Sequence, residues 1–137
     1  MAKKVIKGAF LSLGGTDYSA QVKSATLTIS ASEVDVSNFA TGDWSEMLVA
    51  NLKGTLAIDW VKDADLSGLD AAMWTALGTD AGVTFALRVD DAAKSPTNPE
   101  FTGTVKVTTW GVGGSVGQAF GGSTSWPVSG AVTRSTS

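Results

Sequence analysis

Apolar and hydroxylated residues alternate across residues 22–31, and this pattern constrains the fold more than any other feature of the chain. Ala25, Leu27 and Ile29 occupy alternate positions, and serine or threonine stands between them. Successive side chains of a β-strand point to opposite faces of a sheet, so the pattern predicts a strand with one buried face. A helix would place residues two apart on opposite sides, which excludes it here.

Strand patterns recur along most of the chain. Alternating apolar residues, or apolar runs bounded by Gly, Pro and Asp, are typical of strands. On this basis we predict strands over residues 5–13, 22–31, 52–62, 83–89, 101–110 and 123–133. Pro127 has no N–H for a β-ladder, which places the last strand at a sheet edge or a bulge. The order predicts a mainly β chain of one domain, residues 1–137.

One short helix interrupts the series of strands. Apolar residues fall at helical spacing from Leu69 to Leu77, and Ser67 and Asp70 have the spacing of a capping box. We therefore predict a helix over residues 68–77 that flanks the sheet.

The residues before this helix resemble the start of a calcium-binding loop. Asp63, Asp65 and Gly68 stand at the right positions, but the twelfth position holds Trp74 where a bidentate glutamate is required. We expect these oxygens to cap the helix and to bind no metal.

The chain contains no histidine and no cysteine. Ser-His-Asp and Cys-His catalysis, histidine-bound metals, thiol chemistry and disulfides are therefore excluded. We expect a protein that is not an enzyme and that binds no cofactor. The formal net charge of −3 also argues against a protein that grips nucleic acid, because such affinity comes from many Lys and Arg residues.

Residues 32–50 have no regular period and are predicted to form a long loop. The segment mixes acidic residues with Phe39, Trp44, Met47 and Leu48. Long loops in compact domains are usually functional, and solvent exposure does not explain large apolar residues. We expect this loop to pack on a neighbouring subunit and to be disordered in the free subunit.

Four tryptophans of the strands and helix divide into two predicted groups. Trp60 and Trp74 lie in apolar patterns and are predicted to be in the core. Trp110 and Trp126 fall on the opposite strand parity or near loops, and are predicted to be partly exposed interface residues.

Two further patterns leave other functions open. The glycine-rich segment 111–122 resembles a phosphate loop but joins two predicted strands and lacks the Lys-Ser/Thr of a Walker motif, so we interpret it as a connection. A carbohydrate-binding β-sandwich could use Trp110 or Trp126 as a stacking platform. A small hydrolase would need its acid and base among Asp63, Asp65, Asp90 and Asp91.

An ordered set of turns, strands and loops carries a family resemblance. They are Gly14-Gly15 with turn 16–19, strand 22–30 with residues 33–36, the loop ending at Met47, strand 52–60, helix 69–77, loop 95–99 and the closing segment 126–133. Over nearly the whole chain they resemble the major tail tube protein of long-tailed, siphovirus-like bacteriophages. Tube subunits of contractile tails and injection machines are similar at this level.

The resemblance implies a β-sandwich flanked by one short helix, and a structural subunit of the virion tail. Such subunits form six-membered rings that stack into a hollow tube, with the tape-measure, tail-tip and tail-terminator proteins as partners and DNA passing through the lumen. Residues 1–7 begin like a signal peptide, but Lys7 interrupts the apolar run, so we expect a chain made in the host cytoplasm.

The lumen of such a tube should not attract DNA. Each phosphate that is neutralised adds salt-sensitive affinity, so we expect acidic residues to outnumber basic ones on the inner wall. The candidates are Asp59, Asp63, Asp90 and Asp91, whereas Lys3, Lys4 and Lys7 are expected outside the lumen or at ring junctions.

Overall fold

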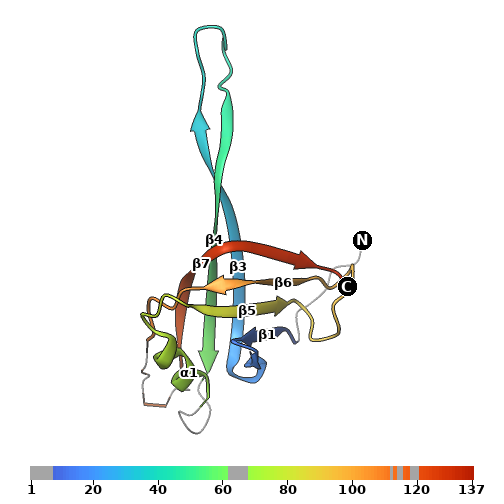
Figure 1. Ribbon diagram of the computed structural model, residues 1–137, viewed down its shortest axis with the longest axis vertical. Helices are drawn as coiled ribbons and strands as arrows, with labels where there is room; N and C mark the ends of the chain where they lie inside the picture. The colour runs from blue at the N-terminus through green and yellow to red at the C-terminus, as the bar shows by residue number, and fades with distance from the viewer. Residues whose placement is uncertain (1–7, 62–67, 112, 114–115, 118–120) are drawn as a thin grey trace.

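The computed structural model describes residues 8–61, 68–111, 113, 116–117 and 121–137. Within these residues the chain forms a mainly β fold with one short α-helix, as predicted (Figure 1). The elements in order are β1 (Phe10–Leu13), β2 (Thr16–Asp17), the 3-10 turn η1 (Ser19–Gln21), β3 (Val22–Asp35), β4 (Met47–Val61), α1 (Leu69–Ala76), β5 (Val83–Arg88), β6 (Glu100–Val105) and β7 (Gly121–Ser135).

The strands form one antiparallel sheet in the order β2-β1-β5-β6-β7-β4-β3. β7 holds the sheet together, because its first half pairs with β4 and its second half with β6. In Figure 1 β5 and β6 run across the direction of β4, and β7 bends from one direction into the other. The two layers expected of a sandwich are therefore two parts of one folded-over sheet.

The prediction of an edge strand at Pro127 is wrong, because β7 lies between β6 and β4. Pro127 pairs with Thr55 one position before the β4 ladder ends at Val128. The chain tolerates a residue without an N–H here because β7 is changing partners. The bulge in β7 comes slightly later, where the ladder with β6 is irregular and Gly130 has φ 86°.

The core lies between the two parts of the sheet and is closed at one end by α1. β1, β4, β5 and β7 contribute side chains that are almost completely buried, and α1 adds Leu69 and Met73. Three indoles stack within it: the ring centroids of Trp60 and Trp110 are 4.7 Å apart, and those of Trp110 and Trp126 are 6.2 Å apart. Aromatic stacking adds to the free energy gained by burial, so this stack is a main support of the body.

Helix α1 forms where it was predicted, and residues from other elements contact its first turn. Gly68 is the N-cap residue and supplies no side-chain cap, and the N–H of Leu69 donates to Oε1 of Gln21 at 3.2 Å. Asp70 accepts a hydrogen bond from Nε1 of Trp110 at 2.7 Å, so it ties the helix to the indole stack. The predicted capping and calcium-like residues Ser67, Asp63 and Asp65 lie outside the described residues.

Candidate assembly surface

The predicted loop 32–50 is mostly a β-hairpin, so the expectation of an irregular loop is wrong. β3 extends to Asp35 and β4 begins at Met47, and only residues 36–46 connect them. The two strands pair from the body outwards and project far beyond it (Figure 1). We call the projecting part, residues 29–52, the arm.

A register shift in the arm explains why its alternation is hard to see in the sequence. Ala31 pairs with Leu52 and Glu33 pairs with Val49, so two residues of β4 stand opposite one residue of β3. Such a bulge interrupts the two-residue periodicity of β4, while the strand remains paired with β3 on both sides of it. Met47, Val49 and Leu52 consequently share a face although their spacing is irregular.

One face of the arm is a continuation of the core face of the body. Leu56 and Ile58 of β4 are buried, and the same face continues outwards through Ile29, Leu52, Val49 and Met47, all of which are exposed. Glu33 and Asp35 of β3 stand opposite Val49 and Met47, so the outer part of this apolar strip follows β4. An apolar strip of this kind indicates a surface that another molecule covers. A two-stranded hairpin is also only marginally stable in water by itself.

The tip of the arm is ordered by short polar side chains and presents aromatic residues outwards. The N–H of Ser37 donates to Oδ1 of Asp35 at 2.8 Å, and the N–H of Glu46 donates to Oγ of Ser37 at 2.8 Å. The hydrogen bonds from Ser37 lower the pKa of Asp35 below its usual value. Trp44 is 84% exposed and Phe39 is fully exposed, so neither ring packs on the arm itself.

The opposite face of β3, β4 and β7 is rich in small hydroxylated side chains. It carries Ser24, Thr26, Thr28, Ser30, Lys53, Thr55, Asp59, Ser123 and Ser125. Oγ of Ser24 donates to Oδ2 of Asp59 at 3.1 Å. Hydrogen bonds from Ser123 and then Ser24 lower the pKa of Asp59, so it is ionised at neutral pH. We call this surface the hydroxyl face.

The structure separates the predicted interface residues into two groups. Phe39, Trp44, Met47 and Leu48 are exposed on the arm. Trp126 is 0% exposed, so its prediction as a partly exposed residue is wrong.

For the tryptophans of the body the prediction is confirmed for Trp60, which is buried, and for Trp110, which is partly exposed. Trp110 is half-buried between Trp60 and Trp126, and Nε1 of Trp126 donates to the carbonyl of Thr109. These rings are therefore occupied within the body and offer no free platform for a sugar. Trp74 was predicted to be in the core, but it is 68% exposed because α1 packs through Leu69 and Met73.

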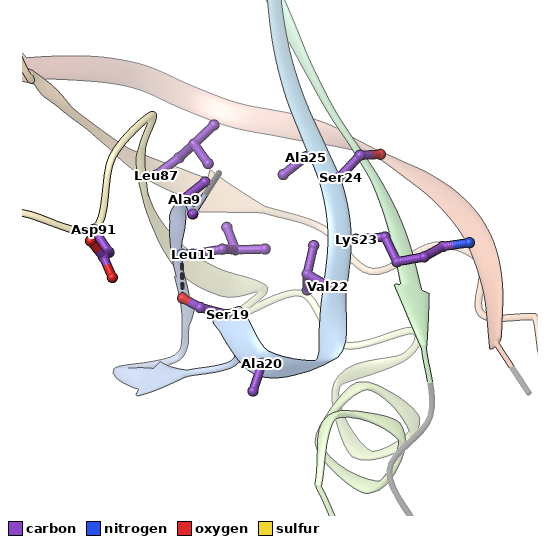
Figure 2. Close-up of a pocket in the computed structure, with 11 residues that line it drawn as sticks. Ala9, Leu11, Ser19, Ala20, Val22, Lys23, Ser24, Ala25, Leu87 and Asp91 are labelled. Carbon is purple, nitrogen blue, oxygen red and sulfur yellow. Dashed lines mark hydrogen bonds between the residues drawn. The ribbon is translucent and has the colours of Figure 1, made fainter. Parts of the chain in front are cut away.

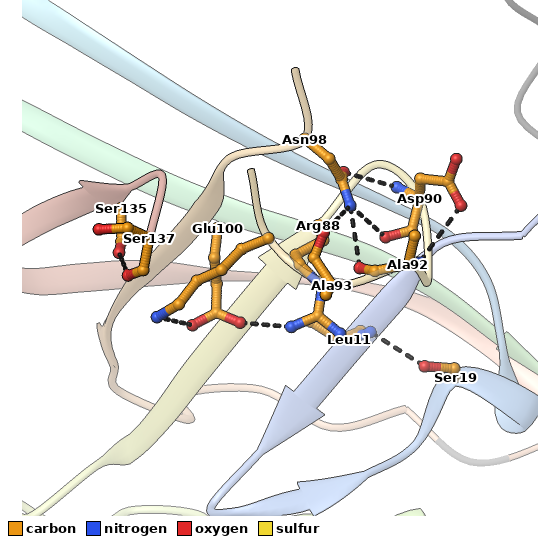
Figure 3. Close-up of polar contacts among 11 residues, drawn as sticks. Leu11, Ser19, Arg88, Asp90, Ala92, Ala93, Asn98, Glu100, Ser135 and Ser137 are labelled. Carbon is orange, nitrogen blue, oxygen red and sulfur yellow. Dashed lines mark hydrogen bonds and ion pairs between the residues drawn. The ribbon is translucent and has the colours of Figure 1, made fainter. Parts of the chain in front are cut away.

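The predicted lumen residues lie on different elements. Asp59 is on the hydroxyl face, whereas Asp90 and Asp91 follow β5 in a loop. Nδ2 of Asn98 holds this loop by donating to the carbonyls of Asp90 and Ala92 (Figure 3). Asp63, Lys3, Lys4 and Lys7 lie outside the described residues.

A cavity of about 390 Å³ opens between β1 and β3, but its lining does not form a catalytic site. Leu11, Val22 and Leu87 contribute apolar surface, and Asp91 is its single carboxylate (Figure 2). General acid and base chemistry on a glycoside needs two carboxylates. Within the part of the chain that the structure describes, no group of three or more acidic residues could hold a metal ion, and no helix is long and apolar enough to cross a bilayer.

The glycine-rich segment is followed by a strand, as predicted. β7 begins at Gly121, so among the described residues a strand, and not a helix N-terminus that could bind a phosphate group, follows these glycines.

No family model and no curated protein matches the sequence. The structure is similar to a chain of the virion of a native gene transfer agent particle, with a TM-score of 0.73, 18% identity and coverage of 97% of this chain and 99% of that chain. It is also similar to a chain of the tail of an empty gene transfer agent particle with C6 symmetry, with a TM-score of 0.66, 15% identity and 92% coverage of both chains. The chain thus has the fold of these virion and tail subunits over nearly its whole length, which confirms the fold expected from the resemblance.

Proposed function

We propose that this chain is the structural subunit of a phage-like tail tube, forming stacked rings around a lumen that conducts DNA. The observation that carries the proposal is the arm, whose apolar face continues the core face of the body but is left uncovered. A subunit of this shape covers the strip only by contact with another molecule. The fold shared with a gene transfer agent tail of C6 symmetry supports another copy of the same chain as that molecule.

A contact between an arm and a different surface of a second copy does not close on itself. Such head-to-tail contacts generate rings where the rotation closes and open filaments where it does not. A tube of stacked rings combines a closed contact within each ring with an open contact from one ring to the next. Residues along the whole arm are available for the contact between rings. The tape-measure, tail-tip and tail-terminator proteins would then contact the tube as a whole.

The hydroxyl face is suited to the wall of the lumen. Its side chains are mostly short and uncharged, and Asp59 adds a negative charge that repels phosphate and offsets the positive charges of Lys53 on this face and of Lys23 nearby. Six copies at −3 each give a ring a formal charge of −18. DNA would therefore gain little salt-dependent affinity while it passes. Asp90 and Asp91 remain candidates for the same wall.

Electron microscopy of negatively stained, purified protein tests the proposal. We expect hollow tubes, formed by the chain alone or after co-expression with a tail-tip protein. A protein that stays monomeric under all conditions, including co-expression with tail partners, would contradict the proposal.

The lumen assignment has a separate test in tubes that still assemble. We expect Asp59→Lys to slow genome delivery, whereas Asp59→Asn should keep most of it because no positive charge is added. Normal delivery by Asp59→Lys tubes, with the residue shown to face inwards, would overturn the role of charge.

A further inference from the structure

An apolar groove of about 260 Å³ opens where the arm leaves the body. Strands β3 and β4 on one side, and β6 and β7 on the other, line it with Ile29, Leu52, Gly54, Phe101, Val132 and Arg134. Gly54 keeps the groove open, because a Cβ at this position would lie 2.9 Å from Cδ1 of Ile29 and 3.1 Å from Cβ of Val128. The groove is large enough to accept one aromatic side chain.

Arg134 gives one wall of the groove a positive charge. It is paired with Phe101 across β6 and β7, and directly paired residues share a face of the sheet. The Arg134 side chain is exposed and makes no ion pair with any described residue. An arginine over apolar surface is suited to a ligand that combines an aromatic ring with a carboxylate.

The arm tip of the same chain has that combination. Trp44 is exposed, and Asp43 and Glu46 flank it. Residues 24–52 contain four acidic residues and no lysine or arginine. The tip and the groove are therefore complementary in both polarity and charge.

The arm cannot bring its own tip to this groove. Ile29 lies in the groove, and the paired strands run outwards from it to Asp35 and Met47. At about 3.3 Å per residue the tip stands roughly 25 Å away from the groove. Folding the tip back would break the β3–β4 ladder, so a tip that fills the groove has to come from another molecule.

We propose that the groove at the base of the arm receives the arm tip of a second copy of this chain. In this contact Trp44 occupies the apolar floor, and the carboxylates of Asp43 and Glu46 lie beside Arg134. The inference rests on the proposed function and deepens it, since it names the surface that accepts the arm. Because tip and groove are about an arm's length apart, each contact leaves a free groove and a free tip for the next copy.

Engineered disulfides test the contact directly, since the chain has no cysteine of its own. Ser45→Cys on the tip combined with Ala131→Cys at the groove should give covalent ladders of subunits in assembled tubes under mild oxidation. Each single variant should not do so. The matched control joins Ser45→Cys to Ala71→Cys, an exposed position on α1 outside the groove, and should also give no ladder.

Charge reversal provides a second readout that does not depend on a cysteine. Arg134→Glu should raise the protein concentration needed for assembly by roughly tenfold or more, as expected for a desolvated charged contact. Adding Asp43→Arg and Glu46→Arg to the same chain should restore assembly. Lys23→Glu reverses an exposed charge away from the groove and should have a much smaller effect.

The outcomes separate this inference from the proposed function. One outcome would leave the proposed function intact and overturn the groove as the acceptor. In that outcome the wild type forms tubes, the variant with Ser45→Cys and Ala131→Cys gives no disulfide ladder, and Asp43→Arg with Glu46→Arg does not rescue Arg134→Glu. A wild-type chain that never forms tubes would overturn both.

Discussion

The same two strands, β3 and β4, lie in two different environments. Within the body Leu56 is 0% exposed, whereas four residues further out on the same face Leu52 is 71% exposed. Along β4 the residues on that face are apolar in both places, although Glu33 and Asp35 of β3 join them in the arm. An apolar strand face therefore indicates a surface that is buried in use, and we propose that in the arm the covering surface belongs to another molecule.

Replacing the two leucines should produce the largest contrast. We expect Leu56→Ala to lower the free energy of unfolding by about 2–5 kcal/mol, because it leaves a cavity in a closed core. Leu52→Ala should change the stability of the free subunit by less than about 0.5 kcal/mol. Denaturant unfolding of both variants as monomers measures this. A similar loss for both would show that the arm is part of the subunit's own core.

Trp44→Ala separates assembly from folding at the arm tip. The ring is exposed, so the variant should fold normally and keep the unfolding midpoint of the wild type. Assembly should fail or require a roughly tenfold higher concentration, because exposed aromatic side chains are the usual anchors of interfaces. Sedimentation of assembled material measures the effect. Normal tubes from this variant would remove the tip from the interface.

Trp110→Phe should have an intermediate effect that is confined to the body. Phenylalanine retains much of the stacking on Trp60 but loses the hydrogen bond to Asp70, so we expect a loss of roughly 1–2 kcal/mol in the free energy of unfolding. Asp70→Asn keeps an acceptor oxygen and should cost less. Equal stability of Trp110→Phe and the wild type would show that this hydrogen bond does not hold α1 to the sheet.

The smallest expected effect is the pH response of the arm tip. Asp35 has a lowered pKa in the folded hairpin, so its contribution to tip stability is present above its unfolded pKa of about 3.8 and is lost as the pH falls through the folded pKa. An NMR titration should place the Asp35 midpoint below 3.8, and Ser37→Ala should move it upwards. An unchanged midpoint in Ser37→Ala would remove Ser37 as the cause.

The sequence predicts most of the body because local patterns there agree with the tertiary structure. The alternation around Leu27 and the helical spacing from Leu69 both correspond to observed elements. Long-range effects were missed: the change of partner along β7 decides that Pro127 lies in a central strand, and packing through Met73 leaves Trp74 exposed. Neither is visible in the neighbouring residues.

The candidate site could be predicted only in outline. Phe39 and Trp44 stand out because large apolar residues occur among acidic ones. The apolar strip through Val49 and Leu52 is hidden by the bulge, since the bulge shifts the spacing. Trp126 was misplaced because strand parity alone does not tell which face of a folded-over sheet is inside.

Hydrogen exchange of free subunits and assembled tubes tests the central claim that the arm is covered by another copy. We expect backbone amides of residues 54–60 in the body to be protected in both states. Amides of residues 29–35 and 47–52 should exchange rapidly in the free subunit, because an isolated two-stranded hairpin opens easily, and should become protected in the tube. Arm amides that exchange equally in monomer and tube would contradict the account.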